Sequence, residues 1–167
     1  PALRFGAAAA LVAVVGQIAL GGWVSSNYAA LACPDFPTCL GSWLPQMDFA
    51  HAFQLHRALG ESADGAPLSS EALSAIHWSH RVGALVVALV VGAFCVSLAR
   101  VAAWRRWSWL LAGSLLVQFG LGVANVVLYL PLPVAVLHNA GAALLLALTV
   151  AINCRLWQAR VAAAGDR

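Results

Sequence analysis

The stretch Ile76-His77-Trp78-Ser79-His80-Arg81 stands where a polar segment meets the apolar run 82–99. Ionisable side chains at a membrane boundary are costly to bury, so they are kept mainly where a function uses them. His138 stands in the same place at the head of a second apolar run. The chain thus sets a histidine at the start of two segments that are candidates to cross a membrane.

Both histidines open the same short motif. His80 is followed by Gly83 and Ala84, and His138 by Gly141 and Ala142, so each reads H-x-x-G-A. In a helix the glycine lies on the histidine's own face, where a missing side chain lets a flat ligand approach the backbone. Helical bundles hold haem iron between two neutral imidazoles from facing helices. We therefore predict His80 and His138 as haem ligands, beside Gly83 and Gly141.

A plainer interpretation is two interfacial histidines bonded to backbone or water. The matched motif argues against it, because an unrelated pair has no reason to share a glycine at the same spacing. His77 has no such glycine, since the third residue after it is His80. We assign His77 no ligand role, leave its function open, and name no catalytic residue.

The composition indicates a membrane protein. Of 167 residues, 62% are hydrophobic and 9% are charged, whereas soluble domains are about 45–50% apolar. Four apolar runs are long enough to cross a hydrocarbon core of about 30 Å at about 1.5 Å per residue. We predict an all-α membrane protein: an antiparallel four-helix transmembrane bundle in one domain, 1–167. The expected spans are about 5–25, 75–99, 107–130 and 134–156, with a loop over 26–74.

The charges are divided between the two sides of these spans. All nine basic residues are arginines, and most fall outside the spans on one side. Five of the six acids lie in the loop opposite. The positive-inside rule then predicts cytoplasmic termini and a periplasmic loop, and the net charge of +3 gives no indication of nucleic-acid binding. The seven arginines are Arg4, Arg100, Arg105, Arg106, Arg155, Arg160 and Arg167, and the five acids are Asp35, Asp48, Glu61, Asp64 and Glu71.

The other two spans also share a pattern. Gln17 is followed by Gly21 in the first span, and Gln118 by Gly122 in the third. Together with the histidine motifs, this predicts a repeated two-helix hairpin with a pseudo-twofold axis. We interpret both glutamines as interhelical hydrogen-bond partners rather than ligands. The first run lacks a usual cleavage site, so we expect no signal peptide, and Pro1 indicates that the native start lies upstream.

The loop holds two cysteines. Cys33 and Cys39 would lie in an oxidising periplasm, which favours a structural disulfide. Zinc binding is the weaker alternative, because the pair has five intervening residues and no second pair. We expect Cys95 and Cys154 to be small buried apolar residues.

The rest of the loop leads to the second span. Apolar residues at helical spacing over 48–59 predict an amphipathic helix on the membrane surface, with His51 and His56 exposed. Ser69 or Ser70 is the expected cap of the helix that follows.

Four segments resemble the heme A synthase family of bacterial and mitochondrial inner membranes. They are QIALGGWV at 17–24, ACPDFPTC at 32–39, IHWSHR at 76–81 and LPLPVAVLHN at 130–139, and the likeness runs from about residue 10 to 157. The family oxidises the C8 methyl of haem O to the formyl of haem A for cytochrome oxidase assembly. Most members have two similar four-helix halves, one for the substrate haem and one for a b-type haem, each held by a histidine pair.

The chain is similar to the second, cofactor half. The resemblance implies an oxidoreductase of the bacterial inner membrane, with haem b iron as cofactor and haem O and haem A as substrate and product of the full enzyme. Its partners would be membrane lipid and an N-terminal four-helix half or a second copy. Arg81 follows His80 as in the family's His-Arg pair, and we expect it to meet a haem propionate. Where the substrate half commonly has a glutamate, three residues before that pair, this chain has His77.

Two other functions are open to such a sequence. A bis-histidine cytochrome b subunit would transfer electrons, although a dihaem type would want histidines at both depths, and the deeper positions hold Cys95 and Cys154. A quinone-linked thiol oxidase also has four helices and loop cysteines, but that chemistry favours C-x-x-C. The sequence does not identify the electron donor, the oxidant or the oligomeric state.

Overall fold

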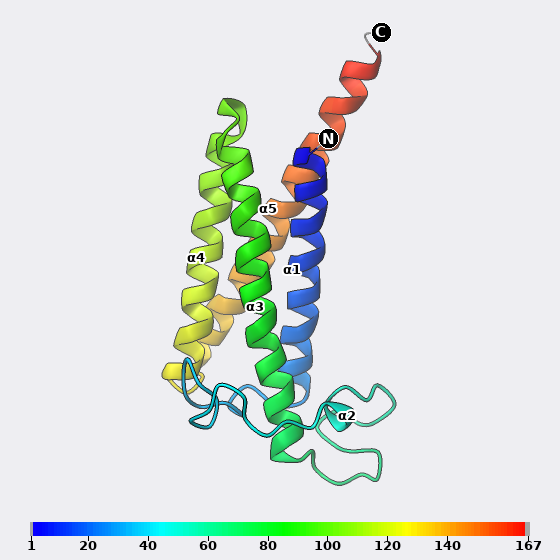
Figure 1. Cartoon of the computed structure of the whole chain (residues 1–167), viewed down its shortest axis with the longest axis vertical. Coiled ribbons are helices and arrows are strands. Elements are labelled where there is room, and N and C mark those ends of the chain that lie inside the picture. The colour runs from blue at the N-terminus through cyan, green and yellow to red at the C-terminus, as the bar shows by residue number, and fades with distance from the viewer. Residues whose placement is uncertain (1, 166–167) are drawn as a thin grey trace.

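The computed structural model describes residues 2–165, with side chains described to residue 158, and it is helical throughout its long elements (Figure 1). This confirms the all-α prediction. A short helix lies in the loop after the first long helix, and a single 3-10 turn joins the second and third. The elements are α1 (Ala2–Ser26), α2 (Phe49–Ala52), α3 (Ser70–Ala99), η1 (Ala102–Trp104), α4 (Arg105–Val127) and α5 (Leu132–Gly165).

The long helices are those of a multi-pass membrane protein. Helices α1, α3, α4 and α5 are each long and apolar enough to cross a membrane. Large aliphatic side chains also face outward, as Leu89 of α3 and Leu116 of α4 show, with exposed fractions of 74% and 73%. Apolar side chains of this kind can face lipid. The backbone can too, because each helix satisfies its own backbone hydrogen bonds.

The four long helices alternate in direction around the bundle (Figure 1). Helix α1 packs against α3 and α5, and α4 packs against the same two helices. Helices α3 and α5 therefore occupy one diagonal of the bundle, and α1 and α4 occupy the other. The predicted antiparallel four-helix bundle is confirmed.

The main core fills the end of the bundle away from the loop. Val91 of α3, Leu111 of α4 and Ile152 of α5 are fully buried there. Two polar side chains join helices within this core. Asn153 donates to the carbonyl of Ala7 (2.9 Å), and the Ser108 hydroxyl donates to the carbonyl of Cys95 (2.8 Å).

The two ends of the bundle carry opposite charge. Both described chain ends and the α3–α4 connection lie at one end in Figure 1, and the loop after α1 lies at the other with the α4–α5 turn. Arg4, Arg100 and Arg105 therefore belong to the first end, and the acids of the loop to the second. The two described chain ends and the α3–α4 connection therefore lie on the same side of the bundle, and the loop lies on the opposite side.

A second cluster holds the loop on the bundle. Val24, Ala29, Leu68 and Ile76 are buried together where α1 ends and α3 begins. The predicted cap of α3 is present, since the Ser69 hydroxyl accepts a hydrogen bond from the backbone N–H of Ala72 (3.2 Å).

The prediction of an amphipathic helix over 48–59 is wrong. Only Phe49–Ala52 is helical, and the structure gives a reason. The carbonyl of Ala52 accepts hydrogen bonds from the Trp23 indole (2.9 Å) and the Arg57 guanidinium (3.3 Å), which end the helix. Residues 53–59 then fold around Arg57, which also donates to the side-chain oxygen of Asn27 (2.8 Å). His51 and His56 are exposed, as predicted.

Candidate functional site

His80 of α3 and His138 of α5 lie on the two diagonal helices, both toward the loop end of the bundle. Gln17 of α1 accompanies His80. Its amide nitrogen donates to the backbone carbonyl of His80 (2.9 Å) and lies 3.1 and 3.5 Å from the two ring nitrogens. Nearly equal distances put the carboxamide over the ring face rather than at either lone pair. Gln17 is thus an interhelical hydrogen-bond partner, as predicted.

Gln118 of α4 lies beside His138, but through a single contact to the ring. Its amide nitrogen lies 3.4 Å from Nε2 of the imidazole. Each candidate ligand is therefore paired with a glutamine from the long helix that precedes its own in the chain. Sequence reasoning noted both glutamines but did not connect them to the histidines.

Glycines make room for both pairs. A Cβ added at Gly83 would lie 2.2 Å from Oε1 of Gln17, and one at Gly141 would lie 2.3 Å from Oε1 of Gln118. These distances are far below van der Waals contact, so any larger residue would displace the carboxamide. The glycine three residues after each histidine, which we associated with a flat ligand, lies against a glutamine.

A second pair of glycines lies beside the imidazoles themselves. A Cβ at Gly21 would lie 3.1 Å from Cε1 of His80, and one at Gly122 would lie 3.2 Å from Cε1 of His138. The sequence signal for this arrangement is the combination of Q-x-x-x-G with H-x-x-G.

Several polar atoms of the site are buried without a partner among the described residues. They are Oε1 of Gln17, Oε1 of Gln118 and Nδ1 of His138. Buried polar groups are normally hydrogen-bonded, so such atoms indicate a site that is completed by something else. The described part of the chain contains no group of three or more His, Cys, Asp or Glu that could hold a bare metal ion. Two histidines with small neighbours fit an iron whose other ligands belong to a porphyrin.

His77 belongs to the loop rather than to this pair. Its side chain is 4% exposed, and Nδ1 lies 3.0 Å from the carbonyl of Ala29. A neutral imidazole that donates to this carbonyl fastens the start of the loop to α3. The role that the sequence left open thus includes a structural contact.

Arg81 is also engaged by the loop. Its two terminal nitrogens donate to the carbonyls of Thr38 (2.7 Å) and Cys33 (2.6 Å), and the guanidinium lies 5.8 Å from the centre of the Phe36 ring. Sequence reasoning missed these contacts, because a charged side chain gives no signal for backbone carbonyls in a distant loop. The expected contact of Arg81 with a propionate stays a prediction, and its Nε is buried without a partner among the residues described.

The loop segment that binds Arg81 is closed by a disulfide. Cys33 and Cys39 are joined in the structure, with an S–S distance of 1.95 Å. We call residues 33–39 the disulfide ring. Of the two other cysteines, Cys95 is buried as expected, but Cys154 is exposed. The expectation of burial was wrong for Cys154, because its side chain lies on the outer surface of the bundle.

Asp35 organises the disulfide ring from within. Its carboxylate accepts hydrogen bonds from the Thr38 hydroxyl and from the backbone N–H groups of Leu40 (2.6 Å) and Gly41 (3.0 Å). These bonds, the one from Thr38 above all, lower the pKa of Asp35 from 3.8 to about 2. The carboxylate therefore stays ionised at any physiological pH.

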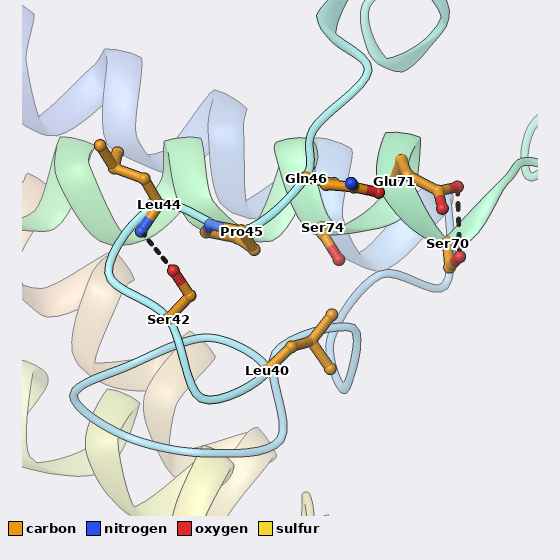
Figure 2. A pocket seen from close by; sticks show the side chains of 8 residues that line it. All are labelled: Leu40, Ser42, Leu44, Pro45, Gln46, Ser70, Glu71 and Ser74. Carbon is orange, nitrogen blue, oxygen red and sulfur yellow. Dashed lines mark hydrogen bonds between the residues drawn. The ribbon is translucent and has the colours of Figure 1, made fainter.

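An open cavity of about 380 Å³ lies between the loop and the first turn of α3. Figure 2 shows its walls, with residues 40–46 on one side and the start of α3 on the other. It contains none of the predicted site residues. The lining side chains are Leu40, Ser42, Leu44, Pro45, Gln46, Ser70, Glu71 and Ser74.

Comparisons with known proteins agree on one family. The sequence profile of the COX15-CtaA family, described as cytochrome oxidase assembly protein, matches residues 1–150. The chain is 44% identical over 147 residues to heme A synthase of Shewanella oneidensis, an alignment that covers 88% of this chain and 44% of that protein. It is 32% identical over 143 residues to heme A synthase of Caulobacter sp. strain K31, with 84% and 39% covered. The chain thus spans less than half the length of either relative. No solved structure matches it.

Proposed function

Because this chain belongs to the COX15-CtaA family of cytochrome oxidase assembly proteins, we propose that it is the haem-binding, cofactor half of a heme A synthase. The full enzyme would oxidise the C8 methyl of haem O to the formyl of haem A. Both relatives carry the name heme A synthase, which supports the reaction. The chain's short span relative to them supports its being one part of that enzyme.

The cofactor would be haem b, and His80 and His138 would hold its iron. The observation that carries this proposal is the matched environment of the two histidines, each with a glutamine and a glycine from the preceding long helix. When bound, such a haem supplies one-electron redox chemistry at the iron. Gly83 and Gly141 leave room for the glutamine carboxamides beside the ligands, and Arg81 lies next to His80 as a donor for a propionate.

The membrane would be the bacterial inner membrane, with the termini of this segment in the cytoplasm and the loop over 26–74 in the periplasm. The arginines at one end of the bundle and the acids at the other support this orientation. The disulfide ring supports it too, because disulfides persist in the periplasm and not in the cytoplasm. The single domain is then a hairpin repeated once, with α1 and α3 equivalent to α4 and α5.

The substrate haem would bind elsewhere, in an N-terminal four-helix half or in another copy of this chain. His77 supports this division. It stands where the family's substrate half commonly has a glutamate, and its Nδ1 lies at hydrogen-bond distance from the carbonyl of Ala29. Only one pair of histidines in this chain shares the motif.

The spectrum of the purified protein tests the proposal. We expect a low-spin, six-coordinate b-type haem in the wild type and its loss in His80→Ala and in His138→Ala. His77→Ala should keep the haem, and the exposed His51→Ala is the matched control. The assignment of ligands would be wrong if His77→Ala lost the haem while His80→Ala kept it.

A further inference from the structure

The end of the bundle opposite the loop gathers arginines, and we call it the arginine end. Its arginines are Arg4, Arg100, Arg105, Arg106 and Arg155. Every acidic residue that the structure describes lies in the loop or in the first turn of α3, at the other end of the bundle. Within the described part of the chain the one salt bridge joins His51 and Asp48, also in the loop. The guanidinium groups of the arginine end are therefore available to an anion from outside the chain.

Two of these arginines lie where α4 and α5 meet. The guanidinium of Arg155 in α5 lies 4.5 Å from the centre of the Trp107 ring in α4. Trp107 therefore marks the side of α4 that faces α5. Ser108, whose hydroxyl donates to a backbone carbonyl of α3 (2.8 Å), marks the side that faces α3. At about 100° per residue, Arg106 lies on the outer face of α4 toward α5 and Arg105 lies toward α3, and both are exposed.

Arg155 and Trp107 lie at the depth of a membrane boundary. Arg155 stands 23 residues after Leu132, the first residue of α5, which is about 35 Å along the helix. A hydrocarbon core is about 30 Å thick, so this guanidinium reaches the headgroup region. Tryptophan is enriched at the same depth, because its ring is apolar and its N–H is polar.

An apolar stripe runs from each of the two arginines toward the middle of the bundle. Leu110 and Val117 follow Arg106 by four and eleven residues, and Leu144 precedes Arg155 by eleven. Each therefore shares a helix face with its arginine, since eleven residues make about three turns. The three side chains are 57%, 61% and 54% exposed. A cation at the headgroup depth beside an exposed aliphatic stripe matches a phospholipid, which has a phosphate at one end and acyl chains behind it.

We propose that Arg106 and Arg155 form a binding site for the phosphate of an anionic glycerophospholipid, in the leaflet at the arginine end. A guanidinium suits this role, because its planar fork can donate two hydrogen bonds to one phosphate. Basic sites between transmembrane helices recognise anionic headgroups in this way. Among the residues described, no carboxylate lies at this end to receive the ammonium group of a zwitterionic lipid. The site needs no bound haem, so the inference goes beyond the proposed function and does not depend on it.

Lipid binding to the whole chain in a neutral detergent tests the proposal. The protein is titrated with phosphatidylglycerol or with phosphatidylethanolamine, and native mass spectrometry counts the lipid molecules that stay bound. We expect the first phosphatidylglycerol to bind more tightly than the first phosphatidylethanolamine. Arg106→Gln and Arg155→Gln should each weaken phosphatidylglycerol binding about fivefold, the effect of one basic side chain on an anionic lipid surface. Neither variant should change the binding of phosphatidylethanolamine.

Arg105→Gln is the matched control, because Arg105 is also exposed and removes the same charge, but lies toward α3. We expect it to leave the affinity for phosphatidylglycerol nearly unchanged. Equal losses in Arg105→Gln and Arg106→Gln would overturn the proposal, because they would show a diffuse attraction to the arginine end instead of a site. Equal binding of the two lipids by the wild type would also overturn it. If Arg155→Gln fails to fold without its contact to Trp107, Arg106→Gln decides, since that variant keeps the contact.

Discussion

The guanidinium of Arg81 donates to the carbonyl of Cys33 at 2.6 Å. Because Arg81 follows the candidate haem ligand His80 in α3, this bond joins the disulfide ring to α3 beside that ligand. A second bond reaches the carbonyl of Thr38 at the other end of the ring (2.7 Å). The ring is therefore held at both ends by one side chain of α3. The loop is thus fastened to α3 one residue after His80.

Replacing Arg81 by lysine should loosen the disulfide ring. Lysine keeps the charge but has no planar fork, so it cannot reach both carbonyls. Hydrogen bonds from charged donors contribute about 1.5–3 kcal/mol each, so we expect a loss of about 2 kcal/mol in the local free energy of opening. Hydrogen–deuterium exchange at the amides of Leu40 and Gly41 measures it. Arg105→Lys, at the opposite end of the bundle, is the control, and unchanged exchange in Arg81→Lys would contradict the prediction.

The pH dependence of the disulfide ring should come from Asp35. Its folded-state pKa of about 2 lies below the ordinary 3.8, so its contribution to stability is fully present above pH 3.8 and is lost as the pH falls through about 2. The protection factor of the Gly41 amide, corrected for the intrinsic pH dependence of exchange, should fall over that range in the wild type. Asp35→Asn should exchange faster at neutral pH and show a weaker acid response. Glu61→Gln, outside the ring, should behave as the wild type does, and an identical acid response in Asp35→Asn would refute the assignment.

A methyl group at Gly83 should destabilise the bundle at the candidate site. The added Cβ would lie 2.2 Å from Oε1 of Gln17, so the carboxamide must move and its hydrogen bond to His80 is strained. Overpacking of this kind costs about 1–3 kcal/mol. Gly92 lies on the same helix with open space around its Cβ position, so Gly92→Ala should be neutral or slightly stabilising. Thermal unfolding in detergent compares the melting temperatures of Gly83→Ala and Gly92→Ala. Equal melting temperatures would show that the Gln17 contact does not contribute to stability.

Features that depend on neighbouring residues in the sequence could be predicted, whereas contacts between residues far apart in the sequence could not. Apolar runs gave four helices, because membrane length and backbone satisfaction leave few alternatives. The pairing of Gln17 with His80 was missed, although its spacing signal was visible, because it requires the register between α1 and α3. The short α2 and the loop contacts of Arg81 depend on carbonyls that are brought together only by the fold. Cys154 was misjudged because a membrane protein exposes apolar residues to lipid.

The four cysteines should differ in reactivity. Cys33 and Cys39 are joined in the structure, whereas Cys95 and Cys154 are free. A thiol reagent applied to unfolded, unreduced protein made in an oxidising periplasm should therefore label only Cys95 and Cys154. A closed ring of this size contributes about 2 kcal/mol on a chain-entropy estimate, so reduction should lower the melting temperature. Labelling of all four cysteines would count against both the disulfide and the periplasmic loop.

Residues 1–167 expressed alone should bind haem b but form no haem A. Oxidation of a methyl group needs a substrate haem beside an oxidising centre, and this chain offers one matched histidine pair. His77 is not free to act on a substrate at that pair, because its Nδ1 faces the carbonyl of Ala29 at 3.0 Å. Arg81 is held by the disulfide ring through two hydrogen bonds, a role that orders the site and performs no chemistry.

Extraction and chromatography of haems from a host without its own synthase measure the outcome. We expect haem O to persist when only this chain is present. Haem A should appear when a similar four-helix half, with a glutamate three residues before its own His-Arg pair, is joined upstream of Pro1. The same fusion carrying His138→Ala is the control for the contribution of this chain, and it should form no haem A. Haem A made by residues 1–167 alone would instead mean that one bundle, or a pair of identical bundles, holds both haems.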